Sequence, residues 1–257
     1  MTEIPRQVPR IRKRRTEKLA EFVAHEIARD IFARKTPVGT KLPSEQVMLE
    51  SYGIGRASLR EGLRILEVYG LLSMKSGPGG GPVVGEVNSA NFGRSATFYY
   101  HLAGATLGEL METRSALEPT IAGLAAERRN KKLLGALRTF MDRQEQLTDE
   151  DLSDINSEQY VDLTGDFHRI VTGLSGNRVL DLTAQSLLDI FSDRTDEIIF
   201  PPEHQQDVLR VHRDIGQAIL DGDANQARDL MALHMKQLVE FFTKRYPGLP
   251  TELIDWR

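Results

Sequence analysis

Three histidines are the residues of this sequence best suited to binding a metal ion: His168, His212 and His234. Neutral imidazole is a good ligand for zinc and nickel, and the interiors of helical bundles are known places for such sites. Each histidine lies in an apolar-periodic stretch on a different predicted helix, so spacing alone does not establish that the three converge. The competing interpretation of each is a core or surface histidine that is satisfied by hydrogen bonds.

Two arginines and a serine open a short predicted helix and are suited to binding DNA. Arg56, Ser58 and Arg60 place hydrogen-bond donors on its first turn. The free amides and positive dipole end of a helix N-terminus suit phosphate contacts, and guanidinium matches guanine O6 and N7 in the major groove. The competing interpretation is a solvated helix face, which is what most surface arginines are.

Arg114 is the candidate for binding an acidic small molecule. Its guanidinium group matches a carboxylate or phosphate through two parallel hydrogen bonds. Beside a metal that is open to one or two carboxylate oxygens, Arg114 would bind an organic acid. The alternative is an ion pair with Glu118, four residues later on the same predicted helix.

The elements that must position the DNA-binding side chains are three short helical patterns near the start of the chain. They cover residues 16–33, 44–53 and 55–69. Thr16 and Ser44 are suited to the N-cap positions of the first two. Gly53 suits the turn before the third helix, because glycine tolerates left-handed backbone angles.

Two short strands are predicted next, over residues 71–74 and 82–87, joined by the glycine- and proline-rich turn 76–82. Helix, turn, helix and hairpin in this order predict a winged helix-turn-helix, whose glycine-rich tip can approach DNA closely. The basic residues 12–15 add nonspecific phosphate binding that weakens as salt rises.

After Val87 the sequence changes to long amphipathic patterns with short polar breaks. We expect helices near residues 89–103, 106–129, 131–148, 155–175, 177–198, 204–221 and 223–246. Consecutive helices with short connections predict an antiparallel all-α bundle. Such a bundle can hold a ligand between its helices, or serve only as a dimerisation module.

Charge is distributed unevenly along the 257 residues, whose net charge is −4. Residues 1–86 carry 15 Lys and Arg against 10 Asp and Glu, whereas the rest carry 18 against 27. Such asymmetry suggests that only the first part meets a polyanion, and the alternative is a basic tail beside an ordinary acidic domain. The sequence has no cysteine, no secretory signal pattern and no apolar run of about 18 residues, so we expect a cytoplasmic protein without a membrane span.

The N-terminal motifs resemble the winged helix of the GntR superfamily. The resemblance covers roughly residues 16–87 and rests on VGTKLPSE (38–45), YGIGRASLREGL (52–63) and EVYGLL (67–72). It implies binding to double-stranded operator DNA through Ser44, Gln46, Arg56, Ala57, Ser58, Arg60, Gly79 and Gly80. The position of Gln46 is often a DNA-contacting arginine in the family, so the operator sequence does not transfer.

The second part resembles the FCD ligand-binding domain of the FadR subfamily. The resemblance rests on LMETRSALEP (110–119), DFH (166–168), SGN (175–177) and the segment between His212 and His234. It implies that His168, His212 and His234 hold one divalent transition metal, zinc or nickel, and that Arg114 and Asn177 bind the effector.

One departure from the FCD pattern concerns the fourth metal ligand. Metal-binding members have an aspartate one helical turn before the first histidine, and here that position is Thr164. Asp162 and Asp166 are near in sequence but point away from the face that carries His168. The site would then be three histidines with water and an effector oxygen, or would bind metal weakly or not at all.

We therefore predict a mainly α protein with a basic arm (1–15), a winged helix-turn-helix (16–87), a helical effector-binding domain (88–248) and a tail (249–257). The predicted function is a homodimeric DNA-binding regulator, not an enzyme, that binds a palindromic operator under control of an organic acid. An acyl-CoA effector without metal is the alternative. Less favoured are a helical interaction module and a metal-dependent hydrolase, which needs a general base that no compact motif supplies.

Overall fold

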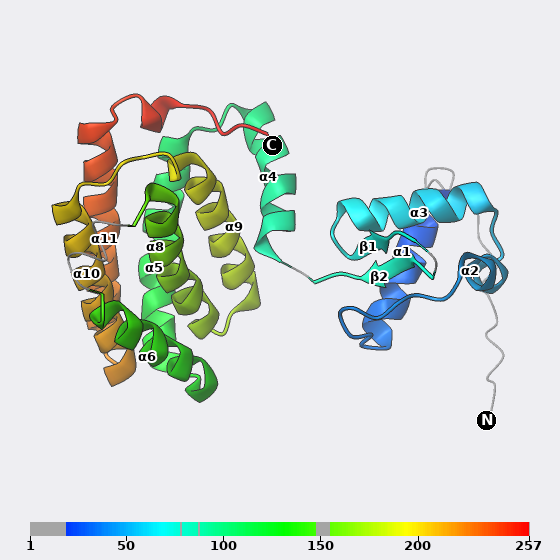
Figure 1. Ribbon diagram of the computed structural model, residues 1–257, viewed down its shortest axis with the longest axis horizontal. Helices are drawn as coiled ribbons and strands as arrows, with labels where there is room; N and C mark the ends of the chain where they lie inside the picture. Colours follow the sequence, from blue (N-terminus) through cyan, green and yellow to red (C-terminus); the bar gives the residue numbers. More distant parts are fainter. Residues whose placement is uncertain (1–18, 78, 87, 148–154, 257) are drawn as a thin grey trace. The chain divides into compact units, whose positions relative to one another are not determined.

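Two units make up the chain, Met1–Asn91 and Phe92–Arg257 (Figure 1). The computed structural model describes residues 19–77, 79–86, 88–147 and 155–256. The predicted basic residues 12–15 and the predicted cap Thr16 lie outside the described residues. Within them, no helix combines the length and the apolar character needed to cross a membrane.

The first unit consists of three helices and a β-hairpin, as predicted. Its elements are α1 (Leu19–Ala33), α2 (Glu45–Tyr52), α3 (Arg56–Val68), β1 (Leu72–Lys75) and β2 (Gly81–Val84). The apolar stripe of α1 packs on that of α3 around Ile27 and Leu59, which are 2% and 0% exposed. Gly62 lets these helices approach closely, because a Cβ atom there would lie only 3.0 Å from Cγ1 of Val23.

The turns of this unit follow from local sequence signals. The Ser44 side chain accepts a hydrogen bond from the Val47 backbone amide and so caps α2. Gly53 ends that helix in the left-handed conformation, with φ of 64°. The predictions for Ser44 and Gly53 are confirmed. The wing is an antiparallel pair in which Leu72 lies opposite Val84.

The second unit is an all-helical bundle, and the predicted fold class is confirmed. Its α-helices are α4 (Ser89–Ala103), which starts in the first unit, α5 (Leu107–Arg128), α6 (Lys131–Glu145), α8 (Ser157–Leu174), α9 (Arg178–Thr195), α10 (Pro202–Asp221) and α11 (Ala224–Arg245). The helix α5 packs against α8, α9, α10 and α11 (Figure 1). Because α5 has buried residues along its whole length, it forms the centre of the bundle.

The end of the chain differs from the predicted tail. Residues 249–251 form a short 3-10 helix, η1 (Leu249–Thr251), and Leu249 and Ile254 are buried in an apolar cluster of the bundle. The Leu107 amide donates to the Glu252 carbonyl, and the Ile254 amide donates to the Ala105 carbonyl. Burial of two aliphatic side chains and this pairing hold the segment against the start of α5.

Candidate DNA-binding surface and effector site

The first turn of α3 presents the predicted DNA-binding arginines to solvent. The side chains of Arg56 and Arg60 are 76% and 72% exposed. Ala57 is exposed and Ser58 is half-buried. Among the residues that the structure describes, no side chain caps α3 at Gly55, which leaves its first backbone amides available to an anion. The start of α3 therefore has the charge and the free donors that a phosphate or a base edge requires.

A groove of about 1200 Å³ lies between α3 and the wing. Gly79 and Gly80 line it, together with Arg60 and Lys75. A Cβ atom at Gly80 would lie 2.2 Å from the Lys75 carbonyl oxygen, so only glycine fits there. The Lys41 ammonium donates to the Gly79 carbonyl, which ties the wing tip to the segment before α2.

Glu45, the first residue of α2, contributes a carboxylate to this surface. One Glu45 oxygen lies 3.4 Å from Nη2 of Arg60, and the other lies 3.9 Å from Nε of Arg56. The exposed Gln46 side chain donates to the Glu50 carboxylate at 2.6 Å. Sequence reasoning did not single out Glu45, although it is the last residue of the Leu-Pro-Ser-Glu motif.

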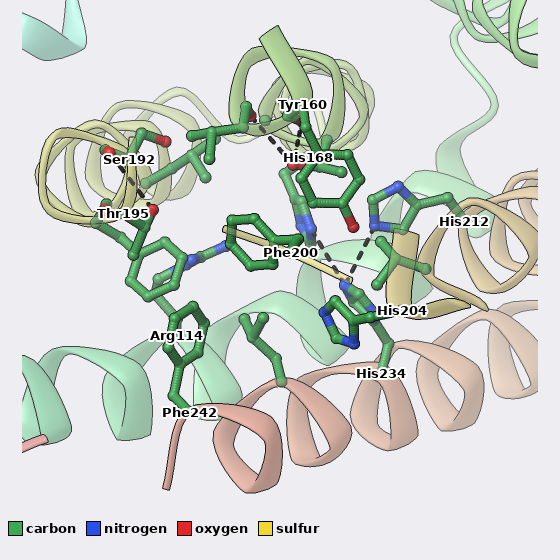
Figure 2. Close-up of a pocket in the computed structure, with 17 residues that line it drawn as sticks. Arg114, Tyr160, His168, Ser192, Thr195, Phe200, His204, His212, His234 and Phe242 are labelled. Atoms are coloured by element: carbon green, nitrogen blue, oxygen red, sulfur yellow. Dashed lines mark hydrogen bonds between the residues drawn. The ribbon is translucent and has the colours of Figure 1, made fainter. Parts of the chain in front are cut away.

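A small cavity of about 40 Å³ lies inside the second unit, between α5, α8, α9, α10 and α11 (Figure 2). This volume has room for an ion and one or two water molecules. Its lining combines polar groups with aromatic and aliphatic side chains: Arg114, Tyr160, Val161, Thr164, Gly165, His168, Leu188, Phe191, Ser192, Thr195, Phe200, His204, Val208, His212, His234, Leu238 and Phe242.

The three predicted histidines meet beside this cavity, which the sequence could not establish. They come from α8, α10 and α11, and their rings converge in Figure 2. Nε2 of His234 lies 3.2 Å from Nε2 of His212 and 3.4 Å from Nε2 of His168. Two nitrogens of a tetrahedral zinc site, each at about 2.05 Å from the ion, are about 3.3 Å apart. These two separations match a metal site, and the ligand atoms of all three histidines lie within 4.8 Å of one another, so the group could hold a metal ion.

Burial keeps two of these rings neutral. Desolvation lowers the pKa of His234 to about 3, and the nearby His168 lowers it further. Desolvation also lowers the pKa of His212 well below its usual value, assisted by the other two histidines and Arg114. A neutral imidazole keeps the nitrogen lone pair that a metal requires.

Arg114 lies in the cavity wall and forms the ion pair with Glu118 that was its alternative interpretation. Its Nη2 and Nε atoms lie 2.6 Å and 2.7 Å from Oε1 of Glu118, and both side chains are buried. The other carboxylate oxygen of Glu118 contacts Nδ1 of His168. Burial alone would raise the pKa of Glu118, but Arg114 and His168 outweigh it and lower the pKa to about 2.

Several buried polar atoms of the cavity wall have no hydrogen-bond partner within the described residues, and two of them are donors that suit an acid. Nη1 of Arg114 and the Tyr160 hydroxyl are buried and find no hydrogen-bond partner within the described part of the chain. Burial raises the pKa of Tyr160, so its hydroxyl stays protonated and can donate. A guanidinium N–H and a phenol O–H of this kind suit an anionic oxygen.

The residues around the expected fourth ligand lie as follows. The Thr164 hydroxyl donates to the carbonyls of Tyr160 and Val161, so it is turned back onto its own helix. Asp162 and Asp166 are exposed, as their spacing from His168 predicts. Among the described residues, the group that could hold a metal ion therefore consists of the three histidines without a carboxylate.

Asn177 is not among the described residues that line the cavity. Its side-chain oxygen accepts hydrogen bonds from the amides of Val179 and Leu180, and so caps α9. The side-chain oxygen of Asn177, which was predicted to contact the effector, is therefore used to cap α9.

Tyr160 and His204 line the cavity but were missed in the sequence. His204 stacks on Phe241 with ring centroids 3.8 Å apart, and it also lines a second pocket of about 220 Å³ between α10 and α11. A signal was present, because the lining residues recur every fourth position: 160, 164 and 168 on α8, 204, 208 and 212 on α10, and 234, 238 and 242 on α11. Such spacing places side chains on one helix face.

Two family descriptions match the chain: "Bacterial regulatory proteins, gntR family" over residues 19–80, and "FCD domain" over residues 109–237. The HTH-type transcriptional repressor NanR of Edwardsiella tarda (strain FL6-60) is 27% identical over 244 residues, which are 91% of this chain and 87% of that protein. NanR of Escherichia coli (strain K12) is 26% identical over 233 residues, with 86% and 83% covered. A solved structure described as Streptococcus agalactiae GntR has a TM-score of 0.66 at 26% identity, covering 86% of this chain and 99% of that one.

Proposed function

Because the chain belongs to the GntR family of bacterial transcriptional regulators and carries an FCD effector domain, we propose that a small organic acid, bound with a metal ion in the helical unit, controls its binding to operator DNA. The similar relatives are named as transcriptional repressors, which supports repression and a regulatory rather than enzymatic role.

The observation that carries the DNA-binding part is the start of α3. It combines two exposed arginines with uncapped backbone amides and lies beside a groove that the glycine-rich wing borders. Arginine there can form paired hydrogen bonds to guanine, while the wing contacts the backbone or the minor groove. Ser44 and Gln46 on the edge of α2 are proposed as further contacts.

The cavity supports a small acid as the effector. Nη1 of Arg114 and the Tyr160 hydroxyl offer two donors to a carboxylate, and the three histidine Nε2 atoms offer a zinc or nickel site next to them. When bound, the ion would supply an open coordination position for an effector oxygen. A cavity of about 40 Å³ must expand for any effector, and it favours a compact acid over the bulky acyl-CoA alternative.

Control of DNA binding follows if the acid binds one arrangement of the bundle better than another. Such a ligand shifts the population toward that arrangement and changes the DNA affinity by the same coupling free energy. A homodimer fits this scheme, because the two-fold symmetry of a dimer matches a palindromic operator and the dimer sets the spacing of its two half-sites.

The test is binding of the full-length protein to the DNA upstream of its own gene, measured by fluorescence anisotropy at fixed salt with a scrambled duplex as control. We expect tighter binding to the native duplex, a dimer by light scattering, and an affinity that changes when members of a panel of small carboxylic acids are added with zinc. Equal affinity for the native and the scrambled duplex at this salt concentration would overturn the assignment of operator binding. If no acid changes the affinity or the thermal stability, the effector assignment fails.

A further inference from the structure

Glu118 contacts both halves of the proposed effector site. Its Oε1 atom lies within 2.7 Å of two nitrogens of Arg114, and its Oε2 atom contacts Nδ1 of His168. The residue is 4% exposed, so water does not screen these contacts. An ion pair at a spacing of four residues is ordinary on a helix surface, but this one is buried and has a third partner on α8.

We propose that Glu118 is a positioning residue that couples binding of the acid to binding of the metal. The inference rests on the proposed function and assigns a role in it to a residue that touches neither ligand. Arg114 would contact the acid, His168 would contact the ion, and Glu118 joins the two side chains.

The first part of this role concerns the tautomer of His168. A neutral imidazole carries one proton, and a carboxylate oxygen in contact with Nδ1 favours the tautomer that carries the proton on that nitrogen. Nε2 then keeps its lone pair, and this is the atom that lies 3.4 Å from Nε2 of His234. A carboxylate behind a metal-binding histidine also fixes the orientation of the ring and raises its basicity.

The second part concerns charge. In the absence of the acid, Arg114 offsets the negative charge of Glu118. An acid carboxylate at Nη1 of Arg114 competes for the guanidinium charge and leaves more of the Glu118 charge to stabilise His168 and the ion. The acid and the metal therefore each strengthen binding of the other, by equal factors because coupling is reciprocal.

The decisive variant is Glu118→Gln, which keeps the size of the side chain and removes its charge. Its matched control is Glu112→Gln, which makes the same change at an exposed position of α5. We expect the zinc affinity of Glu118→Gln, measured by competition with a chromophoric chelator, to fall about 10- to 100-fold, and that of the control to stay unchanged.

A second readout does not depend on metal. In the metal-free wild type, nitrogen NMR shifts should show His168 protonated at Nδ1, whereas Glu118→Gln should populate both tautomers. A Glu118→Gln protein with the zinc affinity and the His168 tautomer of the wild type would overturn the role of Glu118. Wild-type protein that takes up no zinc would overturn the metal centre as well, so the two failures are distinguishable.

The variant Arg114→Met tests whether Arg114 takes part in the coupling between acid and zinc binding or only in the packing of α5. Removing the guanidinium takes away the group that would contact the acid and that pairs with Glu118, so the zinc affinity of this variant should no longer respond to the acid. If the acid still raises the zinc affinity of Arg114→Met by the wild-type factor, Arg114 and Glu118 do not carry the coupling and the proposal is overturned.

Discussion

Nη2 of Arg60 lies 3.4 Å from the carboxylate of Glu45, so an ion pair joins α3 to the start of α2 on the surface proposed to bind DNA. Both side chains are substantially exposed, at 72% and 38%, and pairs of this kind contribute little to stability. The pair matters instead for where the guanidinium points and for how much positive charge it offers to a duplex.

Replacing Arg60 by alanine should weaken binding to the native duplex by about 1–3 kcal/mol, or roughly 5- to 150-fold, if the guanidinium contacts a base. Binding to a scrambled duplex should weaken much less. The measurement is anisotropy with both duplexes at the same salt concentration.

Its control is Arg213→Ala, which removes the same charge from an exposed position of α10. Arg60→Ala protein that binds the native duplex as tightly as this control would show that α3 does not read the operator.

Replacing Glu45 by glutamine should have the opposite effect on nonspecific binding. The change frees Arg56 and Arg60 from a negative charge, so affinity for a scrambled duplex should rise several-fold and depend more steeply on salt. The ratio of native to scrambled affinity should fall, because the arginines lose the partner that orients them.

Glu21→Gln, an equal change of charge on α1, provides the comparison. The idea fails if Glu45→Gln leaves both the scrambled-duplex affinity and its salt dependence at the values of that control.

Zinc should stabilise the helical unit through the three histidines. At a free zinc concentration of one hundred times the Kd, mass action adds about 2.7 kcal/mol, which is roughly 5–10 °C in Tm for a unit of this size. His212→Ala should lose this shift relative to its own metal-free Tm, and a chelator should reverse the shift in the wild type.

His25→Ala is the matched histidine control, because His25 is exposed on α1 in the other unit. A zinc-dependent shift of equal size in His212→Ala and in this control would place the zinc elsewhere.

The buried histidines predict acid lability of the metal-free protein. The pKa of His234 is lowered to about 3 in the folded chain, mainly by burial, from a usual value of 6.5. Above pH 6.5 His234 is neutral in both the folded and the unfolded chain, so the free energy of unfolding does not depend on its protonation. Between pH 6.5 and 3 the unfolded chain binds a proton that the folded chain does not, so stability should fall by about 1.4 kcal/mol for each pH unit from His234 alone.

Urea unfolding at pH 7.5, 6 and 5 measures this slope. His234→Gln should reduce it over the same range, and an unchanged slope would contradict the assignment. Below pH 4.5 a second loss should begin, because Glu118 has a lowered pKa of about 2 and its contribution is lost as the carboxylate takes up a proton.

Two glycine substitutions should act in opposite directions. Gly80→Ala places a Cβ atom 2.2 Å from the Lys75 carbonyl oxygen, so the wing must shift at a cost of about 1–3 kcal/mol and DNA affinity should fall. Gly135→Ala, exposed in α6 with nothing within 4 Å of its Cβ, should add about 1 kcal/mol of stability and leave DNA binding unchanged. Chemical denaturation and anisotropy on both variants test the pair, and a Gly80→Ala protein with normal DNA affinity would exclude the wing from the interface.

The winged helix was largely predictable because its signals are local. Ser44 lies three residues before the amide that it caps, and Gly53 occupies a turn that requires a positive φ. The hairpin register follows from a short turn between two apolar segments. No interaction across the unit is needed to recognise any of these features.

The cavity was less predictable because its contacts join residues far apart in the sequence. The i,i+4 pair of Arg114 and Glu118 was visible, whereas the contact of Glu118 with His168 spans two helices. Tyr160 and His204 carry no motif, and only their four-residue spacing from Thr164 and Val208 marks their helix face. The burial of Leu249 and Ile254 likewise depends on an apolar cluster whose other residues are mostly far away in the sequence.

The chain end that pairs with the start of α5 also carries a tryptophan whose fluorescence can report on its surroundings. Trp256 is the only tryptophan in the sequence, and its ring lies edge-on to Phe98 of α4 with centroids 5.2 Å apart. The Ile254 carbonyl oxygen lies 3.1 Å from Nδ1 of His101, also on α4. A displacement of α4 relative to the chain end would change the surroundings of this indole, so tryptophan emission would report such a movement in unlabelled protein.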